Sequence, residues 1–262
     1  MIRKQKIDKI GFIGSGRVAS HLAVAMYEAG LIVSQIYSPD YNHTTILAEK
    51  VNAQAIRSLK ELSDSIDLII IAINDSAISS LDLSVIRPSI MICHTSGSTS
   101  MDLLKNRLNY GVFYPLQSFS FDNKPNWKEI PICIEANTAA NVDLLKQVAK
   151  KLSNLIYEIN SEERSILHIA AVFVSNFTNA MYSIGEDILD KSNMSLDILR
   201  PLIAETANKV KYSSPKETQT GPAIRNDNLI INKHIQQLQQ LADYADIYKR
   251  ISEIIQKQQN SR

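Results

Sequence analysis

The 262-residue sequence contains only two cysteines and eight glycines, and its charges nearly cancel. Two cysteines do not form the disulfide framework of a small secreted domain, so we expect a reducing, cytoplasmic compartment. A net charge of +1 suggests neither a nucleic acid nor an acidic membrane as partner. No run is typical of a signal peptide or membrane span, and no histidine, cysteine and acidic spacing is typical of a metal site. We therefore expect no metal and an ordinary globular protein.

The few glycines are unevenly placed, since three of the eight fall within six residues near the N-terminus. This cluster follows a strand-like run at 7–13 and precedes a helix-like run at 18–26, which is the context of the dinucleotide fingerprint. Gly14 suits the tight turn, Gly16 lets a pyrophosphate approach the backbone, and Ala19 lets the helix pack closely. A turn used only for packing is the alternative. The cofactor contacts predicted here are Gly14, Ser15, Gly16, Arg17 and Val18.

Strand and helix patterns alternate along the first part of the chain. Several strand-like runs are apolar on both faces, which is typical of parallel strands covered by helices on each side. The pattern predicts an α/β fold, with a Rossmann-like, doubly wound, mainly parallel sheet in residues 1–159. After the first strand, strands are predicted at 31–38, 53–56, 67–73, 89–93, 111–114, 130–135 and 155–159, with helices at 45–51 and 139–152.

No strand pattern follows residue 159, so we expect an all-helical domain over 160–262. Its first long helix has no formally charged residue between Arg164 and Glu186. At 100° per residue, His168, Ser175 and Asn179 share a polar face opposite an apolar stripe. That face could line a substrate cleft, or it could form a contact between helices or subunits. We expect the helical domain to complete the substrate site and to form a homodimer.

Ligands of an open parallel sheet bind at the carboxyl ends of its strands, so the residues there are candidates. NAD enzymes usually place an acid after the second strand, whereas this chain has Ser38 there and Asp40 only after a proline. A hydroxyl near Arg17 suits a 2′-phosphate, which favours NADP over NAD, although no arginine follows Ser38. The remaining predicted cofactor contacts are Asn74, Asp75 and Thr95, and the predicted substrate contacts in this domain are Ser96, Gly97 and Gln117.

Two histidines are candidates for acid–base catalysis, because imidazole titrates near neutral pH. His94 ends a predicted strand and precedes hydroxyl residues, which would equally surround a structural histidine. His168 is the competing candidate on the long helix. In the loop 220–227, Arg225 could hold a substrate carboxylate or phosphate, or form a surface ion pair with Asp227. We also place Ser175, Asn179 and Arg225 among the predicted substrate contacts.

Four segments together resemble an uncharacterised bacterial family whose members are described as NADP oxidoreductases. They are His94–Ser98, Tyr114–Ser120, the pattern from His168 to Phe177, and Thr220–Asp227. The glycine turn and the domain order also resemble the 6-phosphogluconate-dehydrogenase-like superfamily, which includes pyrroline-5-carboxylate reductase. The resemblance covers essentially the whole chain and implies a Rossmann-like domain followed by a helical one. It implies no particular substrate.

One departure from the superfamily affects the mechanism. Its hydroxyacid dehydrogenases carry a catalytic lysine four residues before an asparagine on the interdomain helix. Asn176 matches that asparagine and is a third catalytic candidate, but Val172 occupies the lysine position. The hydroxyacid mechanism therefore does not transfer, and the proton must come from His168 or His94. An imine that arrives protonated would need no strong acid.

The sequence thus predicts an NADP(H)-dependent oxidoreductase that exchanges a hydride with a small polar substrate bound between the two domains. The alternative is a sensor or regulatory protein that binds NADP(H) without turnover, which the missing lysine favours. Binding of an adenine nucleotide without nicotinamide is less favoured, because the fingerprint ends in Ala19 and no P-loop lysine is present.

Overall fold

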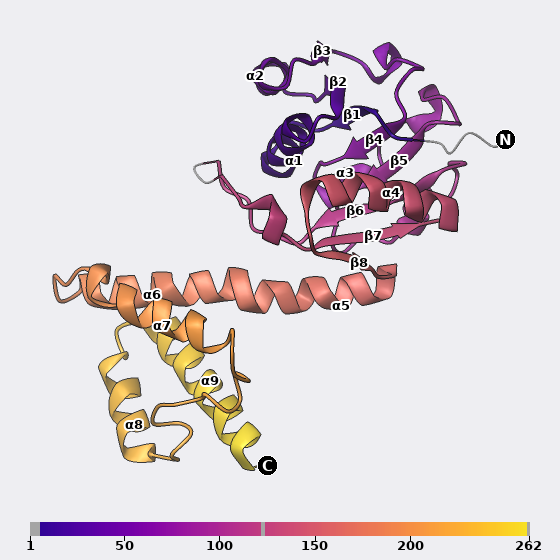
Figure 1. Cartoon of the computed structure of the whole chain (residues 1–262). Coiled ribbons are helices and arrows are strands. Elements are labelled where there is room, and N and C mark those ends of the chain that lie inside the picture. Colours follow the sequence, from indigo (N-terminus) through magenta and orange to yellow (C-terminus); the bar gives the residue numbers. More distant parts are fainter. Residues whose placement is uncertain (1–5, 122–123, 261–262) are drawn as a thin grey trace. The chain divides into compact units, whose positions relative to one another are not determined.

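The computed structural model describes residues 6–121 and 124–260 (Figure 1). The chain forms two compact units, Met1–Asn176 and Phe177–Arg262. The domain boundary predicted between residues 159 and 160 remains a prediction.

The first unit is built on one sheet of eight strands in the order β3-β2-β1-β4-β5-β6-β7-β8 (Figure 1). Among the described strands, every neighbouring pair is parallel except β6 and β7. The predicted Rossmann-like, mainly parallel sheet is therefore confirmed. The strands are β1 Lys9–Ile13, β2 Ile32–Tyr37, β3 Gln54–Ile56, β4 Leu68–Ile71, β5 Met91–His94, β6 Tyr110–Pro115, β7 Ile132–Ala136 and β8 Ile156–Glu158.

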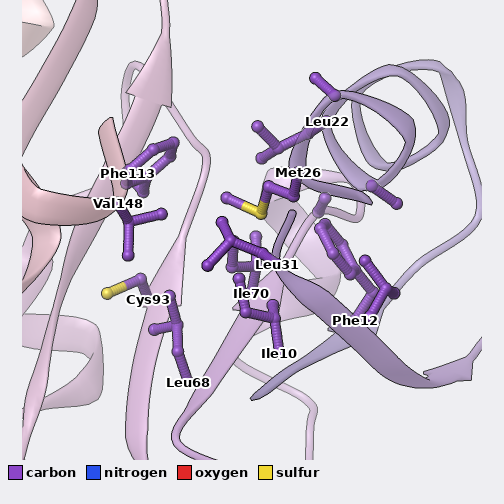
Figure 2. Packing of buried hydrophobic residues seen from close by; sticks show 14 of the residues in the cluster. Ile10, Phe12, Leu22, Met26, Leu31, Leu68, Ile70, Cys93, Phe113 and Val148 are labelled. Atoms are coloured by element: carbon purple, nitrogen blue, oxygen red, sulfur yellow. The ribbon is translucent and has the colours of Figure 1, made fainter. Parts of the chain in front are cut away.

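Both faces of the sheet are covered. All four residues of β4 are buried, and they alternate between two apolar clusters. Leu68 and Ile70 belong to the cluster that contains side chains of the helices α1 and α4 (Figure 2). Ile69 and Ile71 belong to the other cluster. The helices of this part are α1 Arg17–Glu28, α2 Tyr41–Lys50, α3 Asp75–Ile78 and α4 Ala139–Leu152, with single 3₁₀ turns at Leu59–Glu61, Leu83–Val85, Met101–Leu104 and Trp127–Glu129.

A long helical segment follows β8. It begins with a capping box, in which the Asn160 side chain accepts from Glu163 N–H and the Glu163 side chain accepts from Asn160 N–H, both at 2.9 Å. The segment consists of α5 Ser161–Ala171, a π-helical turn at Val172–Phe177 and α6 Thr178–Asp190.

The π-helical turn corrects the predicted polar face. Hydrogen bonds from residue i to i+5 place one extra residue in the turn, which rotates the following side chains by about 100°. The common face predicted for His168, Ser175 and Asn179 assumes 100° per residue throughout, so it is wrong beyond the turn. The sequence shows no glycine or proline that would indicate the irregularity.

The described residues beyond 159 contain no strand, so the predicted all-helical region is confirmed. Pro201 lies in the first turn of α7, where its missing N–H costs nothing. None of the described helices is long and apolar enough to cross a membrane. The helices after α6 are a 3₁₀ turn at Leu196–Ile198, α7 Arg200–Lys209, α8 Asn228–Gln237 and α9 Ala242–Asn260.

Candidate cofactor and substrate site

The turn between β1 and α1 requires glycine at one position and leaves open space at another. Gly14 has φ +119°, and its N–H donates to the carbonyl of Tyr37 at 2.7 Å. A Cβ at Gly14 would lie 2.2 Å from the carbonyl oxygen of Ala72, whereas a Cβ at Gly16 would have no neighbour within 4 Å. Gly16 caps α1 without a side-chain hydrogen bond. The helix therefore presents N–H groups to open space, which is where an anion binds.

A cavity of about 790 Å³ lies over this turn, which we call the nucleotide cavity. Its volume is within the range of cofactor sites. All the predicted cofactor contacts line it, because the carboxyl ends of parallel strands meet along one edge of the sheet. These residues are Gly14, Ser15, Gly16, Arg17, Val18, Ser38, Asn74, Asp75 and Thr95. The predicted substrate contacts Ser96, Gly97 and Gln117 line the same cavity, as does His168.

The loop after β5 is held by a carboxylate on the neighbouring strand end. Asp75 Oδ2 accepts hydrogen bonds from the hydroxyls of Ser96 and Ser98, both at 2.7 Å. Ser96 Oγ also accepts from the backbone N–H groups of Ser98 at 3.2 Å and Thr99 at 2.9 Å. The Ser96 hydroxyl is thus occupied within the loop, so this residue shapes the wall of the cavity.

Arg164 on α5 fixes the same loop from the other side. Its side chain is 1% exposed and pairs with Glu135 on β7. Its Nε donates to the carbonyl of Ser96 at 3.2 Å, and its Nη2 donates to the carbonyl of Thr99 at 2.5 Å. This residue was not predicted from the sequence. The available signal was one arginine at the start of an otherwise uncharged stretch, four residues before His168.

Tyr114, at the end of β6, is paired with His168. The Tyr114 hydroxyl lies 3.1 Å from His168 Nδ1, and burial raises the pKa of Tyr114 to about 12. Gly97 leaves the space for this pair, because a Cβ there would lie 2.5 Å from His168 Nδ1 and 2.8 Å from Tyr114 Cζ. From the sequence, Tyr114 was noted only as part of a motif. Its contact with His168 was not predicted, because the two residues are 54 positions apart.

A second cavity, of about 440 Å³, lies along α5 and the π-helical turn. Tyr114, Gln117 and His168 line both cavities, so they form a shared wall. Ser175 and Asn176 also line the second cavity. The first unit therefore brings together four of the proposed site residues, which are His168, Gln117, Ser175 and Asn176, and adds Tyr114, which was not among them.

Three predicted site residues lie elsewhere. His94 is fully buried and lines neither cavity, and its Nδ1 accepts from Ser96 N–H at 3.2 Å. Asn179 belongs to the second unit and lines a cavity of that unit. Arg225 is an exposed residue of the second unit, and the described residues show no ion pair between it and Asp227, which caps α8 by accepting from Ile230 N–H at 3.2 Å.

His94 should make the fold sensitive to acid. Burial first, and then the positive charge of Arg164, lower the pKa of His94 to about 4, whereas the unfolded chain titrates near its ordinary value of 6.5. Between these values the unfolded state binds more protons, so stability falls as the pH falls. The variant His94→Asn removes this titration and keeps an acceptor near the position of Nδ1. Between pH 6.5 and about 4, its free energy of unfolding should therefore fall by roughly 2–3 kcal/mol less than that of the unmodified protein. Urea unfolding at a series of pH values measures the difference, and parallel curves would contradict it.

The described residues contain no group of three or more histidine, cysteine, aspartate or glutamate side chains that could hold a metal ion.

The fold and the nucleotide cavity define a Rossmann-like protein with a helical C-terminal unit, and known proteins share this organisation. Residues 1–117 match the Rossmann-like domain, and residues 130–255 match a domain of unknown function, DUF2520. A putative NADP oxidoreductase from Bacteroides fragilis is 38% identical, with a TM-score of 0.90 over 96% of this chain and 98% of that chain. The chain belongs to the family of this protein, in which a Rossmann-like domain precedes the DUF2520 domain. The family resemblance predicted from the sequence is confirmed.

More distant structures share the fold. The 1-pyrroline-5-carboxylate reductase of Streptococcus pyogenes is 17% identical, with a TM-score of 0.58 over 96% of this chain and 98% of that chain. An imine reductase from Myxococcus stipitatus, in complex with NADP⁺, is 15% identical, with a TM-score of 0.60 over 95% of this chain and 92% of that chain. No curated protein matches the sequence.

Proposed function

We propose that the protein is an NADP(H)-dependent oxidoreductase that exchanges a hydride with a small substrate carrying a polar, reactive C=O or C=N group or its reduced form. The observation that carries the proposal is the wall formed by Tyr114, Gln117 and His168, which separates a nucleotide-sized cavity from a smaller one. The Bacteroides fragilis relative, described as a putative NADP oxidoreductase, supports it.

The residues of the nucleotide cavity fit NADP(H). The N-terminus of α1 and the open space over Gly16 suit the pyrophosphate. Ser38 lines the cavity, whereas Asp40 does not, because its carboxylate accepts from His43 N–H at 3.0 Å and caps α2. The acid that would favour NAD by binding a ribose hydroxyl is thus engaged elsewhere, and Arg17 supplies a positive charge on the cavity wall.

Bound NADPH would supply a hydride, two electrons and one hydrogen, to the carbon of the C=O or C=N group. The electron pair of the broken π bond then stays on the oxygen or nitrogen, which needs a proton. We assign that proton to the Tyr114–His168 pair. If the Tyr114 hydroxyl donates to Nδ1 of His168, the proton of the imidazole is on Nε2 and can be given from there. If Nδ1 donates to the Tyr114 oxygen instead, the tyrosine hydroxyl can give its proton to the substrate.

Two further residues are proposed to bind the substrate. Ser175 and Asn176 line the second cavity beside the shared wall. Val172 lines it too, at the position where the hydroxyacid dehydrogenases resembled by the sequence have their lysine. His168 with Tyr114 therefore replaces the lysine as the source of the proton in this proposal.

We also propose that the protein forms a homodimer through its helical part. Large apolar side chains are exposed there, among them Ile198 just before α7, Leu202 on α7 and Leu229 on α8, each more than half exposed. Apolar surface of this kind marks a protein interface when it is contiguous.

Replacing Tyr114 by phenylalanine or His168 by asparagine should separate catalysis from cofactor binding. Acid–base catalysis contributes about 10²–10⁴-fold, so we expect losses of at least tenfold in turnover for Tyr114→Phe and more for His168→Asn. NADPH affinity should fall less than turnover does, because both side chains lie on the wall shared with the second cavity and not at the glycine turn, where the phosphates are proposed to bind. Calorimetry measures the affinity, and the disappearance of NADPH absorbance with a panel of ketones and imines measures turnover.

The same measurements decide between the candidate functions. NADPH binding with no turnover of any carbonyl or imine would contradict the oxidoreductase and leave the NADP(H) sensor. Absence of binding by NADPH, NADH and both oxidised forms would contradict both. Equal loss of affinity and turnover in the two variants would assign Tyr114 and His168 a structural role.

A further inference from the structure

The second cavity, which we call the chamber, is apolar over most of its wall. Leu116, Leu167, Ala170, Ala171, Val172 and Val174 line it. Its polar side chains include the shared wall of Tyr114, Gln117 and His168. A molecule in the chamber would therefore bury an apolar body and present its polar group at the shared wall.

Among the described residues, no aspartate, glutamate, lysine or arginine lines the chamber. Apart from the imidazole of His168, whose Nδ1 is already paired with Tyr114, no lining side chain could offer a carboxylate an opposite charge, so its transfer from water is unfavourable. Arg164, one helical turn before His168, cannot supply that charge. Its guanidinium is buried and is already bonded to Glu135 and to the carbonyls of Ser96 and Thr99.

The shared wall has hydrogen-bond capacity left for an uncharged acceptor. Gln117 Oε1 accepts from Ser118 N–H at 2.8 Å, and within the described ranges its Nε2 forms no hydrogen bond. The pair of Tyr114 and His168 likewise has one N–H or O–H beyond the bond that joins the two rings. These donors suit the oxygen of a ketone or the nitrogen of an imine.

We infer that the chamber binds an uncharged ketone, aldehyde or imine with an apolar body, and that it discriminates against carboxylates such as oxo acids and amino acids. This inference rests on the proposed function, and it replaces the generally polar substrate expected from the sequence. The reducible carbon lies at the shared wall, between the chamber and the nucleotide cavity. In the reduction, the hydride would go to this carbon and the proton to the oxygen or nitrogen.

Binding without turnover tests the inference. The two probes are cyclohexanone and a cyclohexanone that carries a carboxylate group on its ring. Each probe is added to the full-length protein with and without NADP⁺. The oxidised cofactor has no hydride to give, so no reaction intervenes. Saturation-transfer NMR should show at least about tenfold tighter binding of cyclohexanone, because the carboxylate has no partner in the chamber.

A variant that adds a positive charge should narrow the preference for the uncharged probe. Val174 lines the chamber and is 76% exposed, so lysine can be placed there without disturbing the core. Because exposed ion pairs contribute less than about 1 kcal/mol, Val174→Lys should bind the carboxylate about two- to fivefold more tightly than the unmodified protein does, whereas Val174→Met, of similar length and uncharged, should not.

The outcomes distinguish the inference from the function on which it rests. Tighter binding of the carboxylate by the unmodified protein, or binding of neither probe while NADP⁺ binds, would overturn the chamber assignment and leave the proposed function standing. An unchanged preference in Val174→Lys would place the probe outside the chamber and overturn it as well. Failure of NADP⁺ itself to bind would overturn the proposed function.

Discussion

Replacing Gly14 by alanine should strongly destabilise the fold, whereas replacing Gly16 by alanine should leave the protein folded and weaken cofactor binding. The two positions are two residues apart in one turn, yet their surroundings are opposite. Gly14 has φ +119°, and an added Cβ would lie 2.2 Å from the carbonyl oxygen of Ala72 on the neighbouring chain segment. Gly16 has φ −73°, and an added Cβ would meet nothing within 4 Å.

The expected magnitudes follow from these surroundings. A left-handed backbone costs an ordinary residue about 1–2 kcal/mol, and overpacking a closed site costs about 1–3 kcal/mol more. Gly14→Ala should therefore lose roughly 3 kcal/mol of unfolding free energy. Gly16→Ala should lose at most about 1 kcal/mol, the difference between glycine and alanine as N-cap residues. Because its methyl group occupies the space assigned to the pyrophosphate, we expect at least about tenfold weaker NADPH binding.

Urea unfolding and NADPH calorimetry on both variants measure these effects. Each variant is the control for the other, because both add one methyl group to the same turn. Normal NADPH affinity in Gly16→Ala would show that the phosphates do not lie against Gly16, and it would remove the main support for the nucleotide cavity. Normal stability in Gly14→Ala would contradict the close approach of the turn to Ala72.

The sequence predicted the parts of the fold that depend on local pattern. The apolar run of β4 indicated a strand covered on both faces, and its residues do alternate between two clusters. The strand ends predicted the lining of the nucleotide cavity, because parallel strands place their carboxyl ends along one edge. The π-helical turn was not predictable, since no residue type marks it, and it changed which side chains share a face.

The alternation of side chains along a strand explains the two errors at the candidate site. His94 is the last residue of β5, and its side chain is buried inside the unit, whereas Thr95, the next residue, lines the nucleotide cavity. Tyr114 lies within β6 and was passed over because only residues beyond the strands were considered, yet it lines both cavities. Which residue at a strand end faces the ligand depends on the register and the length of the strand. Neither can be predicted from the sequence to within one residue.

Arg164 and Glu135 are 29 residues apart, so their pairing could not be predicted from the sequence. This buried ion pair should make a large contribution to the free energy of unfolding. The two side chains are 1% and 14% exposed, and Glu135 also accepts from the N–H and hydroxyl of Ser161. Removing one member of a buried ion pair costs about 3–5 kcal/mol, because the other charge stays buried without a partner. We therefore expect Arg164→Met to lose about that much unfolding free energy, measured by urea denaturation.

The control is the same substitution in an exposed pair. Arg250 Nη1 and Glu253 Oε2 lie 3.3 Å apart on α9, and the two side chains are 70% and 39% exposed. Arg250→Met should therefore lower the free energy of unfolding by less than about 1 kcal/mol. The double variant Arg164→Met with Glu135→Gln should recover part of the loss, because no uncompensated charge remains. Equal losses in the single and double variants would assign the effect to the hydrogen bonds that Arg164 donates to Ser96 and Thr99. A loss no larger than that of Arg250→Met would contradict both explanations.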